Sequence, residues 1–120
     1  MIGRVFTIAT ACFVLLACAP KISPQAEHSR ALVQASTVAP AGERLNLLYK
    51  QSCKACHAVE NSGAPLVQDR SVWDERWKKG LPALLQSTVA GLNGMPPGGQ
   101  CFACTAADYE ALIKFLAGRE

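Results

Sequence analysis

The sequence predicts a small all-α domain in residues 42–120. Apolar residues recur there at the i, i+3, i+4 spacing of a helix, and no segment alternates apolar and polar residues for long enough to be a strand. Long loops containing glycine and proline are expected at 61–66 and 94–100. A domain this small with so much loop usually needs a covalent or cofactor staple to be stable.

Three helices are expected in this unit. The first lies before Ser52, and its apolar face is formed by Leu45, Leu48 and Tyr49. The second covers 83–91 and follows Pro82, which suits the first turn of a helix. Its apolar residues are Leu84, Leu85 and Val89.

The third helix has the clearest boundaries. Thr105 is a good N-cap with Asp108 at the third helical position, and Gly118 closes the helix. Its apolar face is formed by Tyr109, Leu112, Ile113 and Leu116. A bundle of about three to four helices is therefore expected.

Residues 1–17 have the features of a secretory signal peptide. Arg4 supplies the positive charge, and 5–17 is almost wholly apolar. An apolar run of roughly 13 residues is too short for a transmembrane helix, which needs about 20. We therefore expect an exported protein, and export excludes a role with nucleic acid. The formal net charge of +3 is too small to indicate a partner.

The end of the leader indicates lipid attachment. Residues 15–18 (LLAC) resemble the lipobox of bacterial lipoproteins, in which the cysteine, here Cys18, becomes the lipidated first residue. An ordinary cut after Ala19 would precede Pro20, which is a poor position for cleavage. The other alternative is a retained N-terminal anchor. We expect Cys18 to attach the protein to the periplasmic side of a bacterial membrane.

Residues 18–41 are expected to form a flexible tether. They are rich in Ala, Ser, Pro and Gln, a composition that cannot bury a core. A short helix over 31–38 is the alternative. His28 lies in this segment, where we expect it to be solvated.

Residues 53–57 read C-x-x-C-H, the attachment sequence for c-type haem. The thiols of Cys53 and Cys56, one helical turn apart, can add to the two vinyl groups of one porphyrin. His57 then lies beneath the ring as an iron ligand. The sequence therefore predicts one covalently attached haem c.

Two other types of site also contain a C-x-x-C motif. Cys101 and Cys104 form a second C-x-x-C, and the two pairs together could supply a zinc site with four thiolates. Zinc ribbons, however, separate their pairs by about 15 to 20 residues, and the separation here is more than twice that. A thioredoxin-like enzyme is disfavoured because no βαβ pattern surrounds either motif.

Met95 is the candidate for the second iron ligand. It is the one methionine outside the leader, and Pro96 and Pro97 follow it. The two prolines restrict the backbone, so the loop can hold a side chain toward the haem. Ligation by His57 and Met95 leaves no open position for a substrate, and a thioether ligand raises the reduction potential. One-electron transfer is the expected chemistry.

These motifs together resemble class I cytochromes c, and in particular the small bacterial cytochrome c5 type. The resemblance covers the whole of 42–120. It is based on the C-x-x-C-H motif, on Ala64-Pro65 in the next loop, on residues 92–97 (LNGMPP), and on the cysteine pair before the last helix.

The resemblance implies further roles for individual residues. Cys101 and Cys104 would form a disulfide, and the alternative is two reduced cysteines. The backbone carbonyl of Pro65 would accept a hydrogen bond from His57. Trp73 and Arg76 match a W-x-x-R pattern and would lie near the haem propionates. Soluble members of the class lack a lipobox and tether, so free diffusion is not implied for this chain.

The sequence therefore predicts an electron carrier with no catalytic residues and no small-molecule substrate. Its partners would be redox proteins, and basic residues could form a docking patch at the haem edge. Those residues are Lys50, Lys54, Lys78 and Lys79. The alternatives are a haem subunit of a larger oxidoreductase, a peroxidase-like enzyme in which Met95 is displaced, and a structural zinc module.

Overall fold

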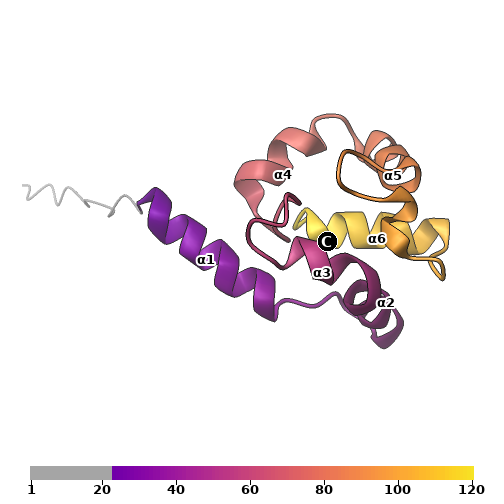
Figure 1. Cartoon of the computed structure of the whole chain (residues 1–120), viewed down its shortest axis with the longest axis horizontal. Helices are drawn as coiled ribbons and strands as arrows, with labels where there is room; N and C mark the ends of the chain where they lie inside the picture. The colour runs from indigo at the N-terminus through magenta and orange to yellow at the C-terminus, as the bar shows by residue number, and fades with distance from the viewer. Residues whose placement is uncertain (1–22) are drawn as a thin grey trace, which may run out of the picture.

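The computed structural model describes residues 23–120, and this part of the chain is helical (Figure 1). The elements in chain order are α1 (Pro24–Thr37), α2 (Glu43–Leu48), a π-helical turn η1 (Tyr49–Cys53), α3 (Lys54–His57), α4 (Arg70–Trp77), α5 (Leu81–Ala90), a 3₁₀ turn η2 (Pro97–Gln100) and α6 (Ala106–Leu116). The extended pairing within 23–120 is one isolated bridge between Leu92 and Met95. The expected all-α class is confirmed. The expected signal peptide and lipidation site lie outside the described residues.

The three expected helices are present, and their ends follow the sequence signals. The first continues through α2, η1 and α3 without a break. Helix α5 has Pro82 in its first turn. Helix α6 begins with a complete capping box, in which the Thr105 side chain accepts from the Asp108 amide and the Asp108 side chain accepts from the Thr105 amide.

Helix α6 lies at the centre of the domain, with α5 and α2 packed against it (Figure 1). The centre of the core is an edge-to-face pair of Tyr49 and Phe115, with ring centroids 5.0 Å apart. Tyr49 is 0% exposed and Phe115 is 1% exposed. This pair joins the helix that precedes the C-x-x-C-H motif to the last helix of the chain.

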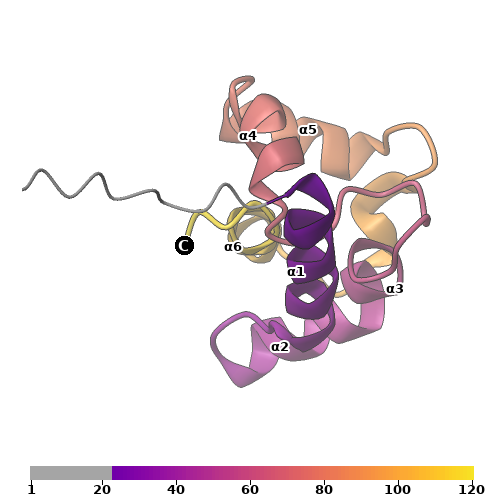
Figure 2. The same cartoon turned by 90° about the vertical axis from the view of Figure 1, so that its left-hand side faces the viewer.

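The expectation of a flexible tether over 18–41 is wrong for the segment that forms α1. The Ser23 side chain caps this helix and Pro24 occupies its first turn. Ala35 is completely buried, so α1 is docked on the domain (Figure 2). Two of the four residues of this segment that pack on the core are alanines, so its apolar surface is small. For this reason the composition suggested a tether. Among the described helices, none is long and apolar enough to cross a membrane.

Helix α4 was not expected from the sequence. Its eight residues are mostly polar, and Trp73 is its buried residue. A helix with so narrow an apolar stripe gives a weak periodic signal. The side chain of Asp69 caps its first turn by accepting from the Ser71 amide. Helix α4 packs beside α5 and carries Trp73 to the site described below.

Candidate functional site

The C-x-x-C-H motif lies where the π-helical turn η1 passes into α3. The amide of Lys54 bonds to the carbonyl of Tyr49, five residues earlier. Such π-helical turns occur frequently at functional sites. Cys53 and Cys56 are free thiols, the first half-buried and the second exposed. Burial raises the pKa of Cys53 to about 11, so this thiol is protonated at neutral pH.

His57 is buried and held in one orientation. Its Nδ1 lies 2.8 Å from the carbonyl oxygen of Pro65. Because a carbonyl oxygen can only accept, Nδ1 carries the proton and Nε2 presents a lone pair. The Val67 amide donates to the His57 carbonyl at 2.7 Å, which ties the same loop to the histidine backbone.

The surroundings of His57 keep it neutral. Burial lowers its pKa, and the positive charge of Arg76 lowers it further, whereas the hydrogen bond to Pro65 acts in the opposite direction. A neutral imidazole with a protonated Nδ1 and an unprotonated Nε2 is the form that ligates a metal. His57 is therefore prepared to bind iron through Nε2.

Trp73 lies beside His57, with ring centroids 6.0 Å apart. Its indole N–H donates to the Leu66 carbonyl at 2.7 Å, so Trp73 supports the loop next to Pro65 and its donor is not free for a propionate. Arg76 is exposed and donates to the Val72 carbonyl at 3.0 Å. Its contact with a haem propionate stays a prediction.

Met95 is at the end of a tight turn. The amides and carbonyls of Leu92 and Met95 bond to each other at 3.0 and 2.9 Å. Gly91 permits this approach because it has a φ of +85°, and a Cβ there would lie 2.9 Å from the Met95 carbonyl oxygen. A Cβ on Gly99 would lie 3.1 Å from Met95 Cε. Both glycines leave space for Met95, so its half-buried side chain has a restricted position.

Cys101 and Cys104 form a disulfide, as the family resemblance implied, with Cα atoms 5.4 Å apart. It follows η2, and the Tyr109 hydroxyl donates to the Cys101 carbonyl at 2.9 Å. This hydroxyl also lies 3.2 Å from the Gly98 carbonyl oxygen. Tyr109 thus joins α6 to the loop after Met95. Tyr109 was expected on the apolar face of this helix, and the sequence contains no local signal for the polar role of its hydroxyl.

The disulfide uses two of the four thiols that a zinc site would need. Within residues 23–120 no group of three or more His, Cys, Asp or Glu side chains is arranged to hold a metal ion. A structural zinc site made from both C-x-x-C pairs is therefore incompatible with this fold.

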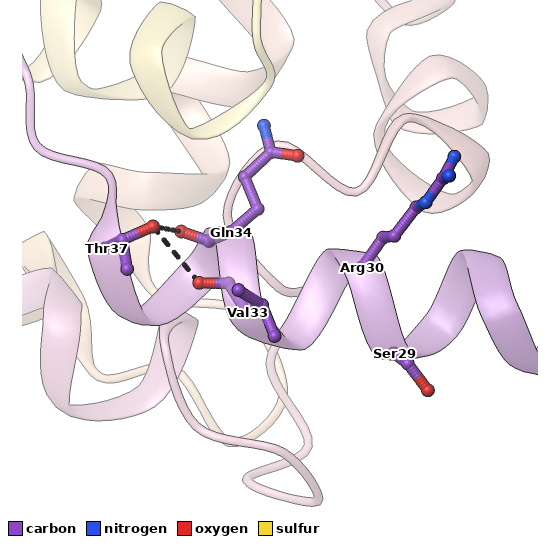
Figure 3. Close-up of a pocket in the computed structure, with 5 residues that line it drawn as sticks. All are labelled: Ser29, Arg30, Val33, Gln34 and Thr37. Atoms are coloured by element: carbon purple, nitrogen blue, oxygen red, sulfur yellow. Dashed lines mark hydrogen bonds between the residues drawn. The ribbon is translucent and has the colours of Figure 1, made fainter.

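Two surface hollows lie beside α1, and neither contains the cysteines of the motif. The first, of about 530 Å³, runs along α1 (Figure 3). It is lined by Ser29, Arg30, Val33, Gln34 and Thr37. The second, of about 330 Å³, has His28 on one side, Glu60 and Pro65 on another, and Val72 and Arg76 from α4 on a third. The second therefore adjoins the residue that orients His57.

Two free thiols in a C-x-x-C pair, followed directly by an oriented histidine in a small helical domain, are the features of a c-type cytochrome. The sequence profile described as "Cytochrome C oxidase, cbb3-type, subunit III" matches residues 40–116. The chain therefore belongs to this family of cytochrome c domains.

The curated relatives include cytochromes c5 and cytochromes c-555. Over 73 residues the chain is 35% identical to cytochrome c5 of Ectopseudomonas mendocina, covering 59% of this chain and 84% of the relative. Over 68 residues it is 40% identical to cytochrome c5 of Azotobacter vinelandii, covering 55% of this chain and 82% of the relative. A cytochrome c-555 of Chlorobaculum tepidum is 29% identical over 75 residues, covering 59% and 69%. The protein is a monohaem c-type cytochrome, and its function is electron transfer.

The residues of the structure fit a covalently bound haem c. Haem c requires two thiols that can form thioether bonds with the porphyrin and an imidazole lone pair that can ligate the iron, and the structure has both. Helix α5 is strongly apolar, yet none of its side chains is fully buried, and Val89 is 53% exposed. Leu92, which follows α5, is 54% exposed. A planar apolar porphyrin would cover such surface.

Proposed function

We propose that Cys53 and Cys56 would hold the haem through thioether bonds and that His57 and Met95 would ligate its iron. The observation that carries this assignment is the His57 imidazole, which the Pro65 carbonyl orients with Nε2 free to ligate. The restricted backbone around Met95 supports the second ligand. The bound haem supplies a one-electron ferric/ferrous couple.

The protein side chains tune that couple. The Met95 thioether is a neutral ligand that favours ferrous iron and raises the potential. The hydrogen bond from His57 to Pro65 makes the imidazole a stronger donor, and burial lowers the local dielectric. With His57 and Met95 as ligands, no open position would remain for a substrate, and the haem would exchange electrons with partners at its edge. Partners are therefore other redox proteins that meet this edge in small, transient complexes.

A haemochrome spectrum in alkaline pyridine tests covalent attachment. We expect the band of a c-type haem, and we expect acid-acetone to leave the haem on the polypeptide. Extraction of the haem by acid-acetone would contradict the thioether bonds. A purified protein with zinc and no haem would contradict the whole assignment.

We further propose that the protein is exported and held at the periplasmic side of the membrane by lipid on Cys18. The LLAC sequence and the apolar leader support this proposal. Mass spectrometry of the N-terminal peptide should find a diacylglycerol-modified Cys18. Cys18→Ser should release the protein from the membrane with an unchanged visible spectrum. An unmodified terminus at another residue would contradict the lipid anchor.

A haem subunit of a larger oxidoreductase is the second candidate. The description of the matching family, a subunit of a cytochrome oxidase, favours it. Extraction of membranes with mild detergent, followed by size exclusion, separates the two proposals. A free carrier elutes as a small protein, whereas a subunit elutes with a large complex that has oxidase activity.

The lysine patch is the proposed contact for an acidic partner. Lys78 pairs with Glu75 at 2.6 Å, and its side chain is well exposed. Lys50 and Lys54 flank Cys53 on η1 and α3. Replacement of both Lys50 and Lys54 by glutamine should reduce the rate of association with a redox partner at low salt and have little effect on that rate at high salt. An equal reduction at both salt concentrations would contradict an electrostatic role.

A further inference from the structure

Helix α1 lies outside the part of the chain that matches the family, which begins at residue 40. It is nevertheless part of the folded domain, because Ala35 belongs to the hydrophobic core at 0% exposure. Three further residues of this segment pack on the same core, Ala31, Leu32 and Val38. Figures 1 and 2 show α1 alongside the domain from two directions.

Polar contacts connect α1 to both ends of the loop that follows His57. Near the first end, His28 Nε2 lies 2.7 Å from a carboxylate oxygen of Glu60. At the other end, the Gln34 amide donates to the Gln68 side-chain oxygen at 2.7 Å. His28 and Gln34 are separated by about 9 Å along the helix. Helix α1 therefore spans the loop between these two contacts.

The loop that α1 spans depends on outside support. It runs from α3 to α4 without regular structure, and it contains two non-glycine residues with left-handed backbone, Asn61 at φ 59° and Gln68 at φ 60°. Such conformations are uncommon for residues other than glycine and persist where surrounding contacts hold them. The middle of the loop supplies the Pro65 carbonyl that orients His57. The hollow of about 330 Å³ beside Pro65 has His28 of α1 as one wall.

We propose that α1 is a positioning element for the proximal iron ligand, which acts by holding the loop that bears Pro65. A docked α1 fixes the loop, the loop fixes the Pro65 carbonyl, and the carbonyl fixes the orientation and donor strength of the imidazole. Detachment of α1 would weaken the hydrogen bond from His57 Nδ1–H to the Pro65 carbonyl, make the imidazole a weaker donor and so raise the reduction potential. This inference rests on the proposed ligation of iron by His57.

Two glutamate substitutions on the same helix make a matched test. Ala35→Glu places a charge and extra volume in a completely buried position, so α1 should detach. Val33→Glu makes the same charge change at a side chain that is 67% exposed, in the outer hollow of α1 (Figure 3), so α1 should stay docked. Both are made in the full-length holoprotein.

Three measurements distinguish a helix α1 that positions the His57 imidazole from one that only covers the loop. Trypsin cleavage after Arg30 reports whether α1 is docked. Deuterium exchange of the His57 Nδ1 proton in the reduced protein, followed by NMR, reports the Pro65 hydrogen bond. The midpoint potential reports donor strength. For Ala35→Glu we expect rapid cleavage, Nδ1 exchange roughly tenfold faster, as for a local opening that has become easier, and a higher potential, because a weaker imidazole donor stabilises ferric iron less. Val33→Glu should match the unmodified protein in all three.

Two results would overturn the proposal. Cleavage after Arg30 that stays slow in Ala35→Glu would show that the Ala35 contact does not hold α1. Rapid cleavage with unchanged exchange and potential would show that α1 only covers the loop. If Ala35→Glu fails to accumulate, the double variant His28→Ala, Gln34→Ala removes both loop contacts and is read in the same way.

Ligation of the iron by His57 is tested separately from the role of α1. The reduced unmodified protein must show the NMR signals of an iron-bound histidine before any variant is compared. Their absence would contradict ligation by His57, whereas their presence with no effect of α1 detachment would contradict the positioning role alone.

Discussion

The two C-x-x-C pairs of this protein have the same spacing and different chemistry. Cys53 and Cys56 lie on a continuous helical segment and remain free thiols, whereas Cys101 and Cys104 lie in a turn and form a disulfide. In the second pair the Cys104 amide bonds to the Cys101 carbonyl at 3.1 Å, which brings the two residues together. Backbone conformation, rather than spacing, therefore distinguishes the two pairs.

The residues around each cysteine pair also differ in burial and chemistry. Burial keeps the Cys53 thiol protonated and therefore unreactive toward disulfides at neutral pH. His57 follows the first pair directly, while Phe102 within the second pair is 96% exposed. The first pair is thus placed to hold a cofactor, and the second to join the Met95 loop to α6.

The largest expected effect is the loss of the haem-bound pair. Cys53→Ala removes one thioether bond, and the domain then folds poorly because its core is small without the cofactor. We expect most of the holoprotein to be lost, as measured by haem staining of the mature polypeptide. The matched control is Cys101→Ala, which should keep its haem. Equal loss in both variants would contradict the separate roles of the pairs.

Met95→Ala tests the proposed ligand in the loop that the Cys101–Cys104 disulfide joins to α6. Without the thioether, the ferric protein should lose its weak charge-transfer absorbance, and the reduced protein should bind carbon monoxide. The potential should fall by on the order of 0.1 V, a small part of the ~0.8 V over which axial ligands tune haem. Leu92→Ala, which keeps the backbone hydrogen bonds of the turn, is the control. Carbon monoxide binding by the unmodified reduced protein would favour an enzyme or sensor instead.

Replacement of both disulfide cysteines by serine should have a moderate effect. The bridge closes a loop of sequence separation 3, so chain entropy predicts a loss of about 2 kcal/mol in the free energy of unfolding. Denaturant titration of the holoprotein measures this loss, and the visible spectrum should stay unchanged. Loss of the Met95 charge-transfer band in this variant would show that the disulfide also positions the ligand.

Thr105→Ala, directly after the disulfide, should cost about 1 kcal/mol because it removes the N-cap of α6. Thr105→Ala is also made in the variant that lacks both disulfide cysteines, and urea titration measures the free energy of unfolding of each protein. If the disulfide and the cap stabilise the start of α6 together, the two losses will not add.

The smallest expected effect concerns Asp108, whose pKa is lowered by its hydrogen bonds to Arg44 and Thr105. A lowered native pKa adds stability above the unfolded pKa of about 3.9, and this stability is lost as pH falls below it. Asp108→Asn should therefore be less stable than the unmodified protein at pH 6, with the difference shrinking toward pH 2. Thermal unfolding at several pH values measures it. A difference that is independent of pH would contradict the role of the carboxylate.

The C-x-x-C-H motif and most of the helices around it could be predicted from the sequence alone. C-x-x-C-H is read from five consecutive residues, and the Thr105–Asp108 capping box from four, because both depend on contacts within one or two helical turns. The resemblance to class I cytochromes c added Pro65 as the partner of His57, and the structure has that hydrogen bond.

The polar groups that support the site and the position of α1 depend on contacts between residues far apart in the sequence, so they could not be predicted from it. The Tyr109 hydroxyl donates to the carbonyl of Cys101, and the Trp73 indole donates to the carbonyl of Leu66. Because every residue has a backbone carbonyl, the sequence does not show which carbonyl a side chain will reach. Residues 24–37 were expected to be flexible because their composition is poor in large apolar side chains. They are helical because the core accepts the small side chain of Ala35, and such shape complementarity exists only once the other helices have packed.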